Sequence, residues 1–388
     1  MKLFHTADWH LGKLVQGVYM TEEQRVVLKQ FLEAIDTEKP DAVIIAGDLY
    51  DRAVPPTEAV NLLDEILAEI VLKRHTPVLC ISGNHDSPGR LNFGSTLMKE
   101  TGLHIVGQLN KDLKSVALKD DFGEVEFHLI PYADPSQVRY LFDDEEVTSH
   151  QKAMKRIVQE IEKDLDTTKR HVFIGHAFVT PGGQEEENTS ESERPLAIGG
   201  VEYVDAALFK SFDYTALGHL HQAHYVLNET IQYAGSPLKY SISEEHHKKG
   251  FFIVNIDGEG QVTLEKRLLI PNRDMRTVEG YMNAILKQPM SEDFVFVKLL
   301  DDTPILSPME QIRTVYPNAM HVERKSFRTS IIAREKESSS RQKVDDISLF
   351  QSFYAEVSGK TPSEETEQLF KEVLADLMDN EREGGTIA

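Results

Sequence analysis

Short apolar runs alternate with longer amphipathic stretches over the first hundred residues. Residues 2–5, 42–46 and 77–81 have the length and composition of buried strands, and helical patterns near 21–39 and 56–73 separate them. This alternation predicts a layered β-α-β-α-β sheet, with functional loops at the carboxyl ends of its strands.

Beyond residue 110 strand patterns dominate, several of them joined by hairpin-length turns. One long helix, near 148–165, interrupts them. We therefore expect two packed sheets with flanking helices over residues 1–270. The strand-like runs lie at 113–118, 125–130, 172–174, 214–217, 225–227, 231–234 and 251–256.

Two later segments differ from this pattern. Residues 271–333 combine short helix patterns with strands near 294–300 and 319–323, which predicts a small α+β domain. Residues 334–343 are polar throughout, which predicts a linker over 334–344.

Residues 345–388 contain two amphipathic helices, the first ending at Gly359 and the second beginning with a capping box at 361–364. A helix pair of this size buries little of its own apolar surface. We interpret it as a docking element for another protein, and folding back onto its own domain is the alternative. The apolar faces consist of Ile347, Phe350, Phe353, Tyr354 and Val357, and of Leu369, Phe370, Val373, Leu374, Leu377 and Met378.

Composition is that of a soluble globular protein: the 388 residues are 40% hydrophobic and 27% charged, enough for a large core and more than one domain. No run approaches ~18 uninterrupted apolar residues, and the N-terminus has no signal-peptide pattern. We therefore expect a cytoplasmic protein without a membrane segment. Its single cysteine, Cys80, lies in an apolar run and predicts a buried, unreactive thiol.

The net charge of −22, from 42 basic and 64 acidic residues, argues against a broad basic surface for nucleic acid. If the substrate is a polyanion, metal ions and a partner must supply the attraction. The sequence G-x-x-x-x-G-K-[ST] is also absent, so we do not expect the chain to hydrolyse ATP.

Five short stretches within the first 221 residues contain metal-ligand side chains, and four of them follow an apolar run. Each alone is weak evidence, since an isolated Gly-Asp is more often a turn or a helix cap. Together they provide about what two adjacent divalent ions need, with positions left for water and phosphate. The side chains are Asp8, His10, Asp48, Asn84, His176, His219 and His221.

The amino-acid sequences of these stretches resemble the signature motifs of the calcineurin-like metallophosphoesterases. Residues 6–12, 47–51 and 83–86 are similar to the nuclease branch of that superfamily, and the similarity extends through the small domain and the helix pair. The resemblance implies a four-layer α/β fold of two packed mixed sheets flanked by helices. It also implies that residues 271–333 form a domain that caps the site and helps select DNA ends.

The resemblance further implies how two metal ions are shared. Asp8, His10, Asp48 and His221 would hold one ion, and Asp48, Asn84, His176 and His219 would hold the other. Mn²⁺ is the expected metal, with Mg²⁺ or another divalent ion as the alternative.

In the same family, His85 matches a catalytic histidine that stabilises charge on the phosphoryl group or protonates the leaving oxygen. Asp51 would orient this imidazole as a carboxylate–histidine dyad. Archaeal and eukaryotic relatives have a histidine at that position, which leaves hairpin and end specificity open. Arg52, Arg90 and Lys13 are weaker candidates for phosphate contacts, and pairing with nearby acids is the competing interpretation of the arginines.

Two polar segments are interpreted as surface. The loop 182–193 contains Glu185, Glu186, Glu187, Glu191 and Glu193 and is expected to be solvated, without a catalytic role. His246 and His247, in a turn rich in Glu and Lys, are expected to be ordinary surface residues.

The function implied by the resemblance is a Mn²⁺-dependent DNA nuclease for recombination and repair. It would be an exonuclease on double-stranded ends and an endonuclease on single strands and hairpins. An SMC-like ATPase docked on residues 345–380 would use the ATP, and a homodimer within a heterotetramer is expected from the resemblance alone. The alternative is a phosphatase or small-molecule phosphodiesterase of the same superfamily. A non-catalytic scaffold is disfavoured, because all seven ligands and His85 are present.

Overall fold

The computed structural model describes residues 1–183, 193, 203–324 and 346–384 and divides the chain into two compact units. The predicted linker 334–344 and the glutamate-rich residues 184–192 lie outside the described residues. Unit 1 consists of Met1–Thr277, Ser291–Phe296 and Tyr316–His321, and unit 2 of Val278–Met290, Val297–Val315 and Val322–Ala388.

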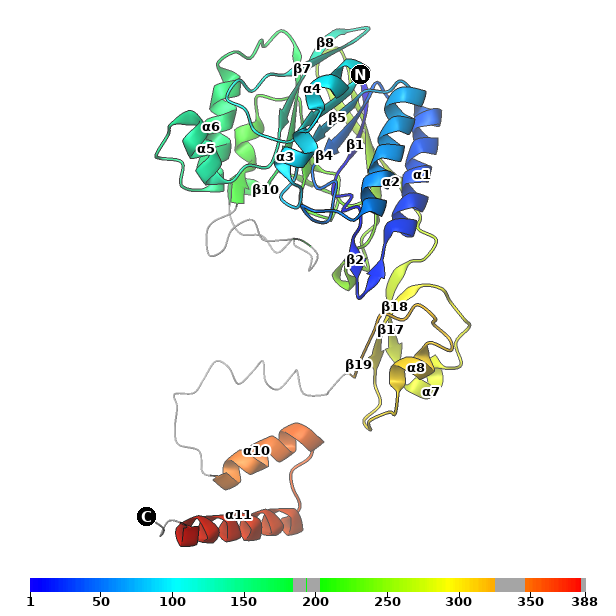
Figure 1. The fold of residues 1–388 in the computed structure, drawn as a ribbon, viewed down its shortest axis with the longest axis vertical. Helices are drawn as coiled ribbons and strands as arrows, with labels where there is room; N and C mark the ends of the chain where they lie inside the picture. Colours follow the sequence, from blue (N-terminus) through cyan, green and yellow to red (C-terminus); the bar gives the residue numbers. More distant parts are fainter. Residues whose placement is uncertain (184–192, 194–202, 325–345, 385–388) are drawn as a thin grey trace. The chain divides into compact units, whose positions relative to one another are not determined.

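One of the two large sheets of unit 1 is six-stranded and mixed, in the order β16-β15-β1-β4-β5-β6. Figure 1 labels its strands β1, β4 and β5. Strands β1, β4, β5 and β6 are parallel, and β15 pairs antiparallel with β1. The predicted β-α-β-α-β sheet is therefore confirmed. The bounds are β1 Lys2–Thr6, β4 Ala42–Ala46, β5 Val78–Ile81, β6 Leu103–Val106, β15 Gly250–Ile256 and β16 Val262–Leu268.

Helices α1 (Thr21–Glu38) and α2 (Thr57–Ala68) lie side by side against this sheet, and α2 continues as the π-helical turn η1 (Glu69–Lys73) (Figure 1). Apolar residues at helical spacing explain the packing. Phe31 of α1 is buried, with its ring centroid 5.6 Å from that of Phe4 and 4.8 Å from that of Phe251. Each such side chain contributes about 1.5–3 kcal/mol by burial. The shorter α3 (Pro88–Asn92), α4 (Ser95–Met98) and η2 (Lys99–Thr101) precede β6.

A second six-stranded sheet has the order β13-β14-β12-β9-β8-β7, with parallel strands β8, β9, β12 and β14 and antiparallel edges. Buried residues such as Ile44 of β4 and Phe127 of β8 belong to one apolar cluster shared by the two sheets. Two packed mixed sheets are thus confirmed. The bounds are β7 Val116–Asp120, β8 Gly123–Ile130, β9 Arg170–His176, β12 Tyr214–Gly218, β13 His224–Val226 and β14 Asn228–Tyr233.

Helices α5 (Pro135–Phe142) and α6 (His150–Glu162) share an apolar cluster with this second sheet. The sequence pattern predicted α6 but missed α5, which has only eight residues. Its start signal is nevertheless a capping box, in which Asp134 accepts from the Ser136 amide and Gln137 accepts from the Asp134 amide.

The remaining elements of the two packed sheets are short. A hairpin of β2 (Leu14–Val15) and β3 (Val18–Tyr19) follows the first strand, and β10 (Phe178–Thr180) pairs with β11 (Tyr203–Asp205). The turns are η3 Pro181–Gly183, η4 Ala206–Phe209 and η5 Ile242–Glu244. Cys80 is buried, as expected.

After residue 270 the elements have the predicted α+β character. A three-stranded sheet in the order β17-β18-β19 is accompanied by two one-turn helices. The domain boundary at residue 271 stays a prediction. The bounds are β17 Met275–Gly280, β18 Phe294–Leu299, β19 His321–Arg324, α7 Met282–Ile285 and α8 Pro308–Ile312.

The two C-terminal helices are α10 (Asp346–Ser358) and α11 (Glu364–Gly384), and they contact each other through stacked rings of Phe350 and Phe370, 3.9 Å apart. Gly359 ends α10 at a φ of 71°, as predicted. The predicted start of α11 is wrong: its cap is Ser363, whose hydroxyl accepts from the Thr366 amide, rather than Thr361. None of the described helices is long and apolar enough to cross a membrane.

Candidate metal centre

All seven expected ligand side chains lie at or just after the carboxyl ends of parallel strands in the two facing sheets. Asp8 and His10 follow β1, Asp48 follows β4 and Asn84 follows β5. From the second sheet, His176 ends β9, and His219 and His221 follow β12. Because parallel strands end at one edge of a sheet, two packed sheets bring both groups of side chains together.

Asp48 lies at the centre of the group. Its Oδ2 atom is 3.6 Å from Nε2 of His10 and 3.4 Å from Nε2 of His176. Its Oδ1 atom accepts a hydrogen bond of 2.9 Å from the His85 amide, which fixes the orientation of the carboxylate. A single carboxylate between two imidazole nitrogens is the arrangement expected of a ligand shared by two cations.

The side chains around Asp48 form two clusters. In the first, Nε2 of His10 is 3.0 Å from Nε2 of His221, and Asp8 contributes an oxygen within 4.8 Å of both ligand nitrogens. In the second, Nε2 of His176 is 2.9 Å from Oδ1 of Asn84. His219 also belongs to the second cluster, because its ring centroid is 5.4 Å from that of His176.

Hydrogen bonds on the far side of two rings determine which nitrogen faces the centre. Nδ1 of His176 donates to the carbonyl oxygen of Ala46 at 2.9 Å, and Nδ1 of His221 donates to the Glu244 carboxylate at 3.1 Å. Both rings therefore turn Nε2 toward the cluster, and Nε2 is the nitrogen that would bind a cation. Metal-binding histidines are typically oriented by such outer partners.

The buried polar atoms at this site fit a divalent cation. Among the residues that the structure describes, Oδ2 of Asp8, Nδ1 of His10 and Nδ2 of Asn84 are buried and have no hydrogen-bond partner. An unpaired buried acceptor costs about 1–3 kcal/mol, more when charged, and coordination by Asp8 would remove that cost. A mixture of imidazole and oxygen donors suits Mn²⁺, Fe²⁺ and Zn²⁺.

The same burial perturbs the protonation of the ligands. Burial raises the pKa of Asp8 to about 7 and lowers the pKa of His10 and His219 well below its usual value. Burial opposes protonation of His176 too, but the nearby Asp48 carboxylate outweighs it and raises the pKa of His176 to about 9. A cation must therefore displace protons from Asp8 and His176, so its affinity should increase with pH.

Four ligand residues have left-handed backbone conformations: φ is 54° at Asp8, 44° at His10, 50° at Asp48 and 104° at His219. Such conformations are uncommon for residues other than glycine and concentrate at functional sites. They are maintained by hydrogen bonds between the loops, including that from the His10 amide to the Asp48 carbonyl at 2.9 Å.

Two glycines allow the ligand loops to approach each other. A Cβ atom at Gly83 would overlap the Asp48 carboxylate, and one at Gly218 would overlap the Ala46 carbonyl group. These two glycines are therefore required by contact with the end of β4 and the loop that follows it, not by a positive φ.

His85 is 7% exposed and lies beside the first cluster, with its ring centroid 4.6 Å from that of His10. The hydrogen bond that orients it differs from the expected one: Nδ1 is 2.8 Å from the backbone oxygen of Asp51. The Asp51 carboxylate instead pairs with Nζ of Lys13 at 2.8 Å and lies 3.8 Å from Nδ1 of His10. The physical reason is that the full charge of Lys13 attracts the carboxylate, while the backbone supplies the neutral acceptor.

Two of the three weaker candidates, Lys13 and Arg52, lie beside Asp51. Lys13 is largely buried against Asp51, and Arg52 is half exposed with its guanidinium 3.8 Å from the same carboxylate. Pairing with an acid is thus observed for both. Arg90 is exposed on α3, where it lines a small pocket together with Ser87.

Three supporting residues escaped the sequence analysis. Gln24 of α1 donates to the Trp9 and His10 carbonyls at 3.0 and 2.8 Å, and no local signal marks it. Asp86 accepts from amides in both ligand loops, and burial raises its pKa to about 7. Its place in Gly83-Asn-His-Asp86 was the available signal. The third is Glu244, which is fully buried beside Lys249.

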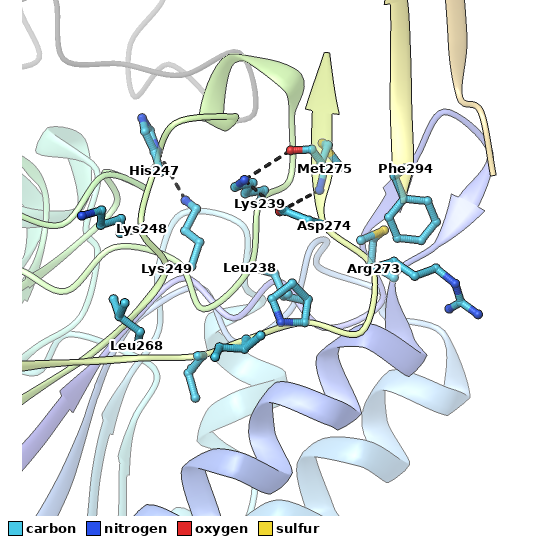
Figure 2. A pocket seen from close by; sticks show the side chains of 14 residues that line it. Leu238, Lys239, His247, Lys248, Lys249, Leu268, Arg273, Asp274, Met275 and Phe294 are labelled. Carbon is cyan, nitrogen blue, oxygen red and sulfur yellow. Dashed lines mark hydrogen bonds and ion pairs between the residues drawn. The ribbon is translucent and has the colours of Figure 1, made fainter. Parts of the chain in front are cut away.

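Two surface expectations need correction. Glu193, expected to be solvated, accepts a 2.6 Å hydrogen bond from the His221 amide. His247 is half buried, with Nδ1 3.5 Å from Nζ of Lys249 (Figure 2). In the turn rich in Glu and Lys, Glu244 and Lys249 therefore face inward, because their charges pair with each other and with His221. His246 is exposed, as expected.

Comparisons with known proteins agree with this geometry. The family model for calcineurin-like phosphoesterase matches residues 1–223, and that for the Type 5 capsule protein repressor C-terminal domain matches residues 271–358. Two relatives are each named as the SbcD component of the nuclease SbcCD. The one from Staphylococcus saprophyticus is 35% identical over 385 residues, covering 98% of this chain and 99% of the relative. The one from Staphylococcus epidermidis is 33% identical over 388 residues, covering 98% and 100%.

Similar solved structures include a dimetal phosphatase from Danio rerio, with 11% identity and a TM-score of 0.41, covering 70% of this chain and 97% of that one. Another is TT1561 of Thermus thermophilus, with 11% identity and a TM-score of 0.38, covering 68% and 98%.

The fold, the site and the matched family define the class: the chain belongs to the calcineurin-like phosphoesterases, which are metal-dependent hydrolases. Within that class, its similarity over nearly the full length of both chains places it in the SbcD family, the nuclease component of SbcCD.

Proposed function

We propose that the protein is a two-metal DNA nuclease that works with an SMC-like ATPase of the SbcC type in DNA recombination and repair. The observation that supports this most is the Asp48 carboxylate, whose Oδ2 lies between Nε2 of His10 and Nε2 of His176. This arrangement favours two adjacent cations and therefore phosphoester hydrolysis. The two staphylococcal relatives are named as nucleases, which supports a nucleic acid as the substrate, and DNA is the one that we propose.

One ion would be bound by Asp8, His10, Asp48 and His221, and the other by Asp48, Asn84, His176 and His219. Mn²⁺ is the metal that we propose, with Mg²⁺ as the alternative. When bound, such a pair supplies Lewis acidity and lowers the pKa of coordinated water.

His85 is proposed as the catalytic residue that is not a ligand. Its Nδ1 donates to the Asp51 carbonyl oxygen, and we propose that its Nε2 faces a phosphoryl oxygen or the departing oxygen. Asp51 would thus be a positioning residue through its main chain. Its carboxylate holds Lys13, and we propose that Lys13, Arg52 and Arg90 contact phosphates along the strand.

The substrates that we propose are double-stranded ends for exonuclease cleavage and single strands or hairpins for endonuclease cleavage. With a net charge of −22, the chain is poorly suited to hold DNA by itself. We therefore propose that the ATPase and a second copy of this chain, in a heterotetramer, provide most of the DNA contacts. Residues 271–333 would cap the site, and the assembly would act on the nucleoid in the cytoplasm.

The helix pair is the proposed docking element for the ATPase, over residues 345–380. Phe350 and Phe370 are used in the contact between the two helices, yet Phe353, Leu369 and Val373 are 61%, 62% and 55% exposed. Exposed apolar side chains at helical spacing are suited to a partner surface.

The decisive experiment offers the purified protein end-labelled duplex, hairpin DNA and p-nitrophenyl phosphate, with and without the ATPase. Each substrate is tested in Mn²⁺, in Mg²⁺ and with chelator. We expect DNA cleavage in Mn²⁺ that chelator abolishes. Hydrolysis of the small ester without cleavage of any DNA, even with the ATPase present, would instead establish the alternative function, a phosphatase.

A further inference from the structure

The buried ion pair Glu244–Lys249 lies directly behind one proposed metal ligand. Oε1 of Glu244 accepts from Nδ1 of His221 at 3.1 Å, and Oε2 is 2.5 Å from Nζ of Lys249. Nζ of Lys249 also donates to the His221 carbonyl at 2.8 Å and to the Ser236 hydroxyl at 2.7 Å. The pair therefore holds both the ring and the main chain of His221.

We infer that Glu244 and Lys249 are positioning residues that tune the affinity of the metal position containing His221, and not that of the position containing His176. This inference rests on the proposed two-metal site. Glu244 and Lys249 lie between the residues that the two family models match, 1–223 and 271–358.

The two histidines differ in what lies behind them. The acceptor behind His221 is a carboxylate with no exposed surface, whereas the acceptor behind His176 is the neutral carbonyl of Ala46. An anionic acceptor makes an imidazole more basic and a stronger ligand than a neutral one does. Of these two histidines, His221 is the one whose outer partner is a side chain and can therefore be changed by substitution.

The charge of Lys249 explains why a carboxylate is tolerated there. Glu244 is fully buried, and a buried carboxylate without a cation is strongly disfavoured. Lys249, 7% exposed, supplies that charge from inside the same turn and leaves Oε1 of Glu244 for His221. The pair thus combines charge balance with orientation.

The same turn also supports His10, the other histidine of this position. Tyr240 donates from its hydroxyl to the Trp9 carbonyl, and its ring centroid is 5.6 Å from that of His10 and 5.9 Å from that of His221. Residues 240–249 therefore support one cluster of ligands, the one that contains His10 and His221. Around the second cluster, the outer hydrogen bond to His176 comes from β4.

Lys249 can be reached from outside the metal site. It forms part of the wall of a cavity of about 220 Å³ that His247, Leu268, Arg273 and Phe294 also line (Figure 2). A small amine entering this cavity could therefore replace the ammonium group of a truncated Lys249. Chemical rescue is thus available as a test.

The main test is Mn²⁺ titration of the full chain, with free hexaaqua Mn²⁺ followed by electron paramagnetic resonance. In Glu244→Gln we expect a roughly 10- to 100-fold loss of affinity at one of two positions, with the other unchanged. In a His176→Ala background the substitution should weaken the remaining ion, and in a His221→Ala background it should have no further effect. An equal loss in both backgrounds would overturn the inference.

A second variant distinguishes the effect of an unbalanced buried charge from the effect of lost positioning of His221. The double variant Glu244→Gln, Lys249→Met removes both charges, so its melting temperature should be near that of the wild type. Its Mn²⁺ affinity at the position containing His221 should nevertheless stay low. Recovery of affinity together with stability would show a merely structural role and overturn the inference. In Lys249→Ala, methylamine should restore the affinity of the His221 position, and no response to methylamine would also count against it.

Asp120→Asn is the matched control. Asp120 forms another buried pair, with Arg170, at the far end of the second sheet, and its substitution should leave both Mn²⁺ affinities unchanged. A wild-type chain that binds fewer than two ions would refute the proposed metal centre instead, and so the two failures are distinguishable.

Discussion

Replacing Gly83 by alanine should displace Asp48 and thereby damage both proposed metal positions at once. The added Cβ atom would lie 2.1 Å from Oδ1 of Asp48, against at least 3.4 Å for ordinary contact, so the carboxylate must move by about 1.3 Å. Asp48 cannot rotate away freely, because its Oδ1 accepts from the His85 amide.

A misplacement of about 1 Å costs about 100-fold in rate, and overpacking costs about 1–3 kcal/mol of stability. We therefore expect Gly83→Ala to fold, to melt at a lower temperature and to lose about 100-fold in turnover of bis-p-nitrophenyl phosphate. Both Mn²⁺ affinities should fall together, because Asp48 is shared. This distinguishes the variant from Glu244→Gln, which should affect one position.

The control is Gly89→Ala, since a Cβ atom at Gly89 would lie no closer than 3.6 Å to its nearest neighbour, Nε2 of Gln108. It should bind Mn²⁺ and turn over like the wild type. If Gly83→Ala binds two ions with unchanged affinity and reacts at the normal rate, the contact between the two loops does not position Asp48.

Three further predictions concern other parts of the chain. His85→Leu should bind both ions and lose about 10²–10⁴-fold in turnover, as measured by Mn²⁺ titration and rate; normal cleavage would remove His85 from the mechanism. Burial lowers the pKa of His5 from 6.5 to about 3, so only the unfolded chain gains a proton in that window. The free energy of unfolding should therefore decrease as the pH is lowered below about 6.5, by up to about 1.4 kcal/mol per pH unit. Urea titrations of His5→Asn should show a smaller dependence on pH, and equal slopes for the variant and the wild type would contradict this. Leu369→Asp, at a side chain 62% exposed, should block co-purification with the ATPase without changing the melting temperature, and unimpaired co-purification, there or after deletion of 345–388, would refute docking.

The ligand stretches could be predicted from the sequence because their signals are local. Asp48 directly follows an apolar strand and a glycine, and Gly83 and Asn84 repeat that arrangement one residue beyond the end of the next strand. Strand ends of this kind meet by topology alone. Helix α1 was predicted for the same reason, since its apolar positions recur at the helical period.

The supporting residues could not be predicted, because their burial depends on contacts distant in sequence. Glu244 lies in a turn whose composition is typical of an exposed segment, and only its contact with His221 makes it an inward-facing residue. The prediction for Asp51 named the right residue but the wrong oxygen atom. The sequence indicated that Asp51 and His85 are neighbours, but pattern does not distinguish a carboxylate from a backbone oxygen of the same residue.

The division of the ligands between two sheets has a consequence for folding. Asp8, His10, Asp48 and Asn84 come from one sheet, and His176, His219 and His221 from the other, so any ion bound by both groups is a cross-link between the two halves of unit 1. Metal that binds only the folded chain stabilises it by mass action, roughly 2.7 kcal/mol at a hundred times the dissociation constant. The supply of metal would then determine how long the two sheets stay together, as well as whether a phosphoester is cleaved.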